Sequence, residues 1–172
     1  MGAIGGRVAV SDAELITPGG VFAYQAYYAV KNEPSDNRDN NFGSRLFDPS
    51  FNGSSWSTST TSALLPGSVL QRWTGSTLSS GSDGSDDGAF YVAVRVTGPV
   101  EGFFHYEYAI QNRDNSRGGG GIRIPVCPDA RVINAGFHDI DDDAGNDWTL
   151  GHVGDEIVVQ PVGDNPIEWL SL

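Results

Sequence analysis

Apolar and polar side chains alternate along several segments of the chain with a period of two. Between residues 21 and 30 an apolar set recurs at every second position: Phe22, Tyr24, Ala26, Tyr28 and Val30. Successive side chains of a β-strand point to opposite faces of its sheet, so this set shares one face. The segment is therefore predicted to form a strand.

A longer alternation predicts a β-hairpin from Phe90 to Asn112 at the centre of a sheet. In its first half, the side chains expected to face the core are Phe90, Val92, Val94 and Val96. Those expected to face outward are Tyr91, Arg95 and Thr97. In its second half, the apolar face is Phe104, Tyr106, Tyr108 and Ile110. The turn between the halves is predicted at Gly98-Pro99.

Similar but shorter patterns predict further strands at residues 122–126, 132–138, 156–160 and 167–172, and weaker ones at 44–47 and 69–73. Helical signals are few: Ser11 to Glu14 resembles a capping box, but Pro18-Gly19 ends any helix soon after it. Two stretches, 54–62 and 79–88, consist mainly of Ser, Thr, Gly and Asp and are predicted to be loops. The fold class expected is all-β: an antiparallel β-sandwich, jelly-roll or immunoglobulin-like, in one domain from 1 to 172.

Composition narrows the functions that this fold could serve. The chain has 172 residues and a formal net charge of −12. Such a surface repels phosphate backbones and anionic lipid heads, so nucleic-acid and membrane partners are disfavoured, whereas divalent cations are attracted. The sequence contains no Gly-x-Ser-x-Gly, no His-Glu-x-x-His and no pair of Cys-x-x-Cys motifs. The lone Cys127 follows an apolar run and is expected to be a buried thiol.

An acidic stretch after residue 137 is the first candidate site, because five aspartates fall within nine residues, 139–147. Calcium is bound by several hard oxygens on a sharply turning loop, and the predicted ligands are Asp139, Asp141, Asp143 and Asp147. The spacing departs from an EF-hand, since its twelfth position would be Leu150. The alternative is a solvated acidic turn in which Asp side chains cap backbone amides.

His105 and Glu107 alternate on one predicted strand and therefore project from the same face. Together with His138, they would serve a hydrolase or lyase that acts on polysaccharide. The alternative is a polar pair on the outer face of the sheet, tied to a neighbouring Arg or to backbone. Trp56 and Trp148 lie in polar surroundings, where each could stack on a sugar ring; the alternative is ordinary packing.

The segment from Phe104 to Arg117, with Ile124-Pro125-Val126 and Gly136 to Asp139, resembles an uncharacterised domain of secreted, planctomycete-type bacterial proteins. That family carries a similar HYEYA…N…SDR…PV…GFHD pattern, in proteins that are often large and multidomain. The resemblance covers residues 89–172 well and the first half loosely. It implies export and a β-rich fold, and it assigns no catalytic residues.

In that family the segment like 165–170 usually continues into another aromatic strand, whereas this chain stops at Leu172. We therefore expect either a fragment of a longer protein or a last strand supplied from elsewhere, as in strand-donation assembly. The leading hypothesis is an extracellular or cell-surface structural, adhesive or assembly module, stabilised by Ca2+, that binds other subunits without catalysis. The alternatives are a module that binds cell-surface glycan and a polysaccharide-acting enzyme.

Overall fold

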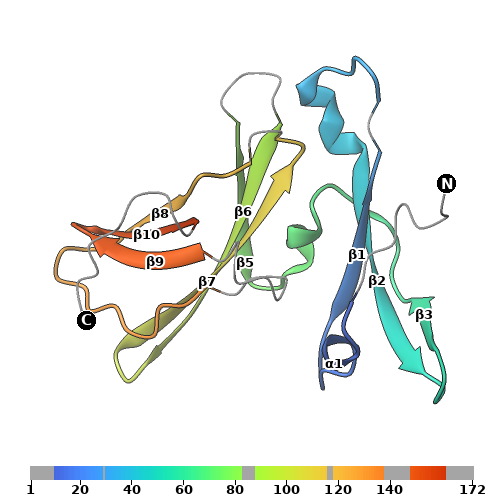
Figure 1. Cartoon of the computed structure of the whole chain (residues 1–172), viewed down its shortest axis with the longest axis horizontal. Helices are drawn as coiled ribbons and strands as arrows, with labels where there is room; N and C mark the ends of the chain where they lie inside the picture. The colour runs from blue at the N-terminus through green and yellow to red at the C-terminus, as the bar shows by residue number, and fades with distance from the viewer. Residues whose placement is uncertain (1–9, 29, 83–87, 116–117, 138–147, 162–172) are drawn as a thin grey trace. The chain divides into compact units, whose positions relative to one another are not determined.

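A computed structural model describes residues 10–28, 30–82, 88–115, 118–137 and 148–161 (Figure 1). The chain separates by internal contacts into two compact units, Met1–Ser116 and Arg117–Leu172. The expectation of one domain stays a prediction, because compact units are defined by contacts rather than by independent folding. In the described part of the chain, no helix is long and apolar enough to span a bilayer.

The first sheet of unit 1 is formed by β1 (Phe22–Tyr27), β2 (Phe42–Phe51), β3 (Trp56–Thr60) and the short β4 (Leu65–Pro66). β2 pairs antiparallel with the other three strands. The strand predicted at 21–30 is confirmed over the residues of β1, and the one predicted at 44–47 is part of β2. β3 lies inside a segment that was predicted to be a loop, because pairing with β2 offsets the low apolar content of its Ser and Thr side chains.

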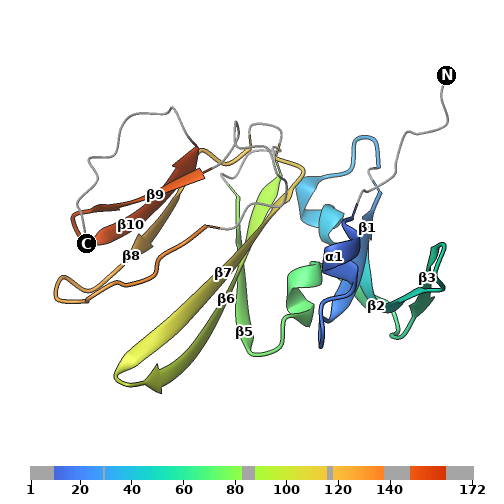
Figure 2. The same cartoon turned by 60° about the horizontal axis from the view of Figure 1, so that its bottom comes forward.

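In the described part of unit 1, three short helices accompany the strands (Figure 2). α1 (Asp12–Leu15) begins with the expected capping box, in which the Ser11 and Glu14 side chains each accept a backbone N–H of the other residue. η1 (Ser35–Asn40) leads into β2. η2 (Val69–Arg72) contacts both β2 and β6, and it replaces the strand predicted at 69–73. Its N-cap Ser68 accepts from Leu70 N, which favours a helical turn over a strand.

The second sheet of unit 1 has the strand order β5-β6-β7, with β5 spanning Ser76–Gly81, β6 Ala89–Val100 and β7 Phe103–Arg113. β6 and β7 form the long antiparallel hairpin that the sequence predicts. β6 is its central strand, and β7 lies at the edge of the sheet.

The face of the hairpin that is buried differs from the one predicted. Ala89, Tyr91 and Ala93 are buried, whereas Val96 is exposed. The buried face packs toward the first sheet, where the Tyr91 ring meets Phe42 edge-on with centroids 5.8 Å apart. Two alanines on this face allow close approach, and Tyr91 places its hydroxyl against a carboxylate. Small and amphipathic side chains therefore occupy the interior here, while the larger apolar ones lie outside.

Unit 2 contains a three-stranded antiparallel sheet in the order β8-β10-β9. Its strands are β8 (Ile122–Pro125), β9 (Trp148–Val153) and β10 (Glu156–Pro161). The central strand carries the buried Ile157, Val158 and Val159. The predicted strands at 122–126 and 156–160 are confirmed, but 132–137 forms no strand and β9 was not predicted. Residue 138 and the predicted strand at 167–172 lie outside the described residues.

Several antiparallel sheets and very little helix make this an all-β, sandwich-like fold, as the alternation predicts. Cys127 is exposed rather than buried, because the strand before it ends at Pro125 and the chain turns away.

Candidate interaction surface

Residues 96–106 form the distal part of the β6–β7 hairpin, which we call the hairpin arm. β5 pairs with β6 only from Phe90 to Arg95. Beyond Arg95, the two strands of the arm pair only with each other among the described strands. Figure 1 shows the hairpin extending past the end of β5. A two-stranded ribbon of this kind covers few of its own side chains.

The arm ends in a tight turn at Glu101-Gly102, later than the turn predicted at Gly98-Pro99. Both turn residues have positive φ angles, 52° and 86°, as two-residue hairpin turns with the twist of the strands require. Gly98 lies instead in β6, where the register with β7 is irregular between Thr97 and Val100. A Cβ atom at Gly98 would lie 2.8 Å from the carbonyl oxygen of Phe103, so a side chain is excluded at this irregularity.

One face of the hairpin is apolar and exposed. Val96 pairs with Tyr106 and Val94 with Tyr108, so these four side chains share a face, and Phe104 and Ile110 extend it. Tyr106 is 55% exposed and Phe104 54%, while Tyr108 and Ile110 are each 39% exposed. Val100 and Phe103 add exposed apolar surface next to the turn. Contiguous exposed apolar side chains of this kind mark interaction surfaces.

The opposite face of the hairpin is buried around Tyr91 and Ala93, and further along the strands it carries the predicted pair His105 and Glu107. Glu107 lies directly across from Arg95, and their side chains form an ion pair with N–O distances of 2.5 and 2.6 Å. The Arg95 guanidinium also lies 5.0 Å from the centre of the Trp73 ring. His105 faces Thr97 and is exposed. Glu107 is therefore tied to a neighbouring Arg through its Oε2 atom, as the alternative of a polar pair on the outer face expects.

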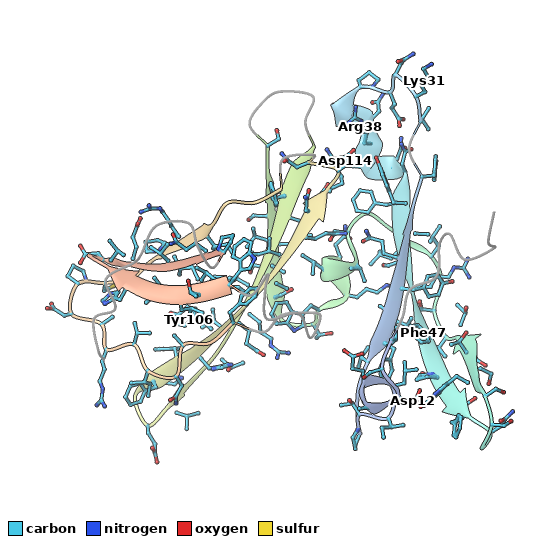
Figure 3. All side chains as sticks on the ribbon, viewed as in Figure 1. Asp12, Lys31, Arg38, Phe47, Tyr106 and Asp114 are labelled. Atoms are coloured by element: carbon cyan, nitrogen blue, oxygen red, sulfur yellow. The ribbon has the colours of Figure 1, made fainter. Side chains whose placement is uncertain are left out.

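Residues 89–91 and 111–114 form the other end of the hairpin, which we call the hairpin base. Charged and phenolic groups hold it against the first sheet. Asp39 on η1 accepts hydrogen bonds from Arg113 and from the Tyr91 hydroxyl, the latter at 2.6 Å. Asp114 forms an ion pair with Arg38 at 3.2 Å (Figure 3). Arg113 is buried although it is charged, and the carboxylates of Asp39 and, at 3.4 Å, Asp114 offset its loss of hydration.

Two tyrosines at this junction, Tyr91 on the hairpin and Tyr27 on β1, ionise with more difficulty than a free tyrosine. Burial, and then the charge of Asp114, raises the pKa of Tyr91. Burial also raises the pKa of Tyr27, and its 2.9 Å hydrogen bond to Asp114 adds to that effect. Neither phenol is therefore poised to lose its proton as an acid or a nucleophile near neutral pH. Their positions are consistent with a structural role.

A cavity of about 380 Å³ opens beside the hairpin base. Its lining residues are Asp39, Asn40, Pro66, Gly67, Ser68, Gln71 and Tyr91. Ser68 is fully buried, and its hydroxyl donates to the Gln111 side chain at 2.5 Å. The polar groups of the cavity are thus largely engaged in joining η1, η2 and the hairpin. Sequence reasoning missed this cluster, because its members are separated by tens of residues and no local motif links them.

The two tryptophans proposed for sugar stacking are each half-buried and in contact with other side chains. Trp56 donates from Nε1 to Asp12 Oδ1 at 2.7 Å, and its ring centre lies 5.2 Å from that of Phe51. Trp148, the first residue of β9, stacks on Phe137 with a centroid distance of 5.7 Å. These contacts correspond to the packing alternative.

The predicted calcium ligands Asp139, Asp141, Asp143 and Asp147, and His138, lie outside the described residues. Within the described ranges, no three His, Cys, Asp or Glu side chains gather as a metal site would require. The acidic stretch therefore stays a prediction from the sequence.

Comparisons of the chain with models of protein families, with curated proteins and with solved structures found no match. The resemblance to a domain of secreted planctomycete-type proteins therefore stays an expectation.

Proposed function

We propose that the chain is an extracellular module for adhesion or assembly that works without catalysis and binds its partner through the hairpin arm. The observation that carries this proposal is the exposed apolar face of the hairpin, centred on Phe104, Tyr106 and Tyr108. Aromatic side chains contribute strongly to protein interfaces because each removes about 150–250 Å² from water when it is buried. The arm offers several such groups without a partner among the described residues.

The charges near the arm support binding rather than catalysis. General acid–base chemistry requires a carboxylate or imidazole that is free to exchange a proton with a substrate. Glu107 is held by Arg95, and Asp39 at the hairpin base accepts from Arg113 and Tyr91. These carboxylates stabilise the hairpin, which presents the apolar surface in a defined conformation.

Calcium binding by Asp139, Asp141, Asp143 and Asp147 remains part of the proposal. Calcium that binds only the folded chain would stabilise it by about 2.7 kcal/mol at a hundred times the dissociation constant. We therefore expect calcium to raise the melting temperature and a chelator to reverse the effect. A melting curve that neither reagent moves would remove calcium from the proposal.

Binding of a glycan chain is the second candidate, favoured by the geometry of β7. Phe104, Tyr106 and Tyr108 occupy alternate positions of one strand, so their rings are spaced about 7 Å apart along a flat surface. Aromatic rings in a row on a sheet suit stacking against successive sugar rings. This surface replaces Trp56 and Trp148 as the place where we would look for sugar binding.

The test of the proposed function compares two tyrosines of similar exposure. Tyr106 is 55% exposed on the arm and Tyr28 is 61% exposed in unit 1 outside the strands. We expect Tyr106→Ser to weaken binding about tenfold or more, which corresponds to about 1.4 kcal/mol, and Tyr28→Ser to leave it unchanged. Sedimentation velocity measures self-association, and a glycan array measures sugar binding.

Circular dichroism would confirm that both variants fold. Equal effects of the two substitutions, or no binding by the unchanged chain in either assay, would contradict the proposed function.

A further inference from the structure

β7 is a long edge strand without the features that usually protect such an edge. It runs from Phe103 to Arg113, and no described strand pairs with its outer side. An open edge leaves a row of backbone N–H and C=O groups without strand partners. Natural edges are commonly blocked by Lys, Pro, bulges or short length, yet β7 contains neither Lys nor Pro. The register irregularity of the hairpin falls between Thr97 and Val100, on β6.

We propose that the partner of the hairpin arm is a second copy of this chain, whose β7 pairs antiparallel with the first β7 about a two-fold axis at Tyr106. The inference rests on the proposed function, because it names the partner and places it along the open edge of β7, the strand that carries the apolar face of the arm. The pairing would join two three-stranded sheets into one continuous sheet of six strands.

Symmetry restricts how two identical edge strands can pair. When the apolar faces of both copies stay on the same side, one residue of β7 must face itself across the two-fold axis, and its neighbours pair outward from it. The choice of register is therefore a choice of the central residue. Tyr106, Glu107 and Tyr108 are the candidates near the middle of the strand.

The side chains favour Tyr106 as the centre. In this register Phe104 faces Tyr108 of the second copy, which pairs aromatic rings, and His105 faces Glu107 of the second copy, which pairs an imidazole with a carboxylate. The seven residues involved, 103–109, are all exposed or half-buried. The apolar faces of the two copies then form one continuous strip.

The neighbouring registers are less favourable. With Glu107 at the centre, two carboxylates would lie directly opposite each other, which is destabilising. With Tyr108 at the centre, Phe103 would face Arg113, which is buried in the hairpin base and bonded to Asp39. Charge complementarity and burial therefore both favour the register in which Tyr106 lies on the two-fold axis.

Disulfide trapping tests the register directly in the full chain. Cys127 is exposed, so every variant carries Cys127→Ser to remove the background thiol. Residues that face each other in an antiparallel pair have Cα atoms about 4.5–5.5 Å apart, within the range of a disulfide. We expect Tyr106→Cys to form a covalent dimer on mild oxidation.

Two further variants retain Tyr106 and serve as matched controls. In the proposed register the two copies of residue 104 lie about 14 Å apart along the strands, beyond disulfide reach. Phe104→Cys alone and Tyr108→Cys alone should therefore stay monomeric on oxidation, whereas an equal mixture of the two should give a covalent heterodimer.

The outcomes separate this inference from the proposed function. Self-association that depends on Tyr106, together with the expected cross-links, supports both. If the chain self-associates but Phe104→Cys links to itself or the mixture does not link, the register is wrong and the assembly function stands. If the chain stays monomeric yet binds a glycan through Tyr106, the second copy is excluded as the partner. A monomer that binds no glycan overturns both.

Discussion

The base and the arm of the β6–β7 hairpin are built from the same two strands. Each departs from the usual placement of side chains: the base buries a charged side chain, and the arm exposes apolar ones. At the base, a charged arginine, Arg113, is buried beside Asp39 and Tyr91. On the arm, Phe104 and Tyr106 are more than half exposed. The polar end of the hairpin is thus internal, and the apolar end faces solvent.

This contrast shows how one hairpin can combine a fixed support with a binding surface. Ion pairs with a buried member, such as Arg113 with Asp39, are sensitive to geometry, because a buried charge without a partner carries a large desolvation penalty. They therefore hold the hairpin in one orientation against the first sheet of unit 1. Exposed aromatic side chains contribute little to folding, but they stabilise a complex when a partner covers them.

The largest expected effect on stability is at the hairpin base, from Asp39→Ala. The substitution removes the Tyr91 acceptor and one carboxylate of the buried Arg113 guanidinium, which keeps only its longer contact of 3.4 Å to Asp114. We expect a loss of about 3 kcal/mol in the free energy of unfolding, toward the low end for broken buried pairs because Asp39 itself is 59% exposed. Urea denaturation measures the change.

The matched control is Asp48→Ala, which removes an exposed carboxylate from β2. Its effect should stay within about 0.5 kcal/mol. Similar losses from the two substitutions would show that Arg113 does not depend on Asp39, and the distinction between base and arm would then have no energetic basis.

A smaller effect at the hairpin base should appear as a dependence on pH. Burial, and then the charge of Asp114, raises the pKa of Tyr91 in the folded chain above its unfolded value near 10. Below that pH the Tyr91 hydroxyl keeps its proton in both the folded and the unfolded chain, so its full contribution to the free energy of unfolding is present. Above it the unfolded state loses the proton first, so the free energy of unfolding falls as the pH rises through the folded pKa.

Tyr91→Phe should lower the free energy of unfolding at pH 7 by about 1.5–2 kcal/mol, because a hydrogen bond to a carboxylate is lost. It should also make the decline above pH 10 shallower. Thermal melts of both chains between pH 7 and 11 would test this, with Tyr106→Phe on the arm as the control. An unchanged slope in Tyr91→Phe would assign the alkaline decline to other groups.

The sequence predicts the hairpin but not which of its faces is buried, and the reason is physical. Alternation shows that Tyr91 and Val92 point in opposite directions, but hydrophobicity alone favours Val92 as the inner side chain. The partner that decides the matter is Asp39, which is distant in the chain and accepts the Tyr91 hydroxyl. Tertiary contacts of this kind leave no local signal.

β3, β5 and β9 were missed for a related reason, and β5 extends into the stretch 79–88 that was predicted to be a loop. The Ser and Thr side chains of β3 resemble a loop by composition, and only pairing with β2 makes the segment a strand. The candidate surface was visible in part, since Phe104, Tyr106 and Tyr108 stand out in the alternation. Their exposure could not be predicted, because a strand pattern does not show where the neighbouring strand β5 ends.

The smallest expected effect compares an ion pair whose two side chains are half-buried with the Asp39–Arg113 pair, whose arginine is buried. Arg95 and Glu107 are each about one-third exposed, and their pair lies where the arm begins. Glu107→Gln keeps the size of the side chain and removes its charge, so the free energy of unfolding should fall by less than about 1 kcal/mol, since water screens such pairs. Denaturation in urea measures this change under the same conditions as Asp39→Ala. A loss as large as that of Asp39→Ala would mean that the charges beside the arm are as important to folding as those of the base, and the hairpin would then have to be treated as one uniformly anchored element.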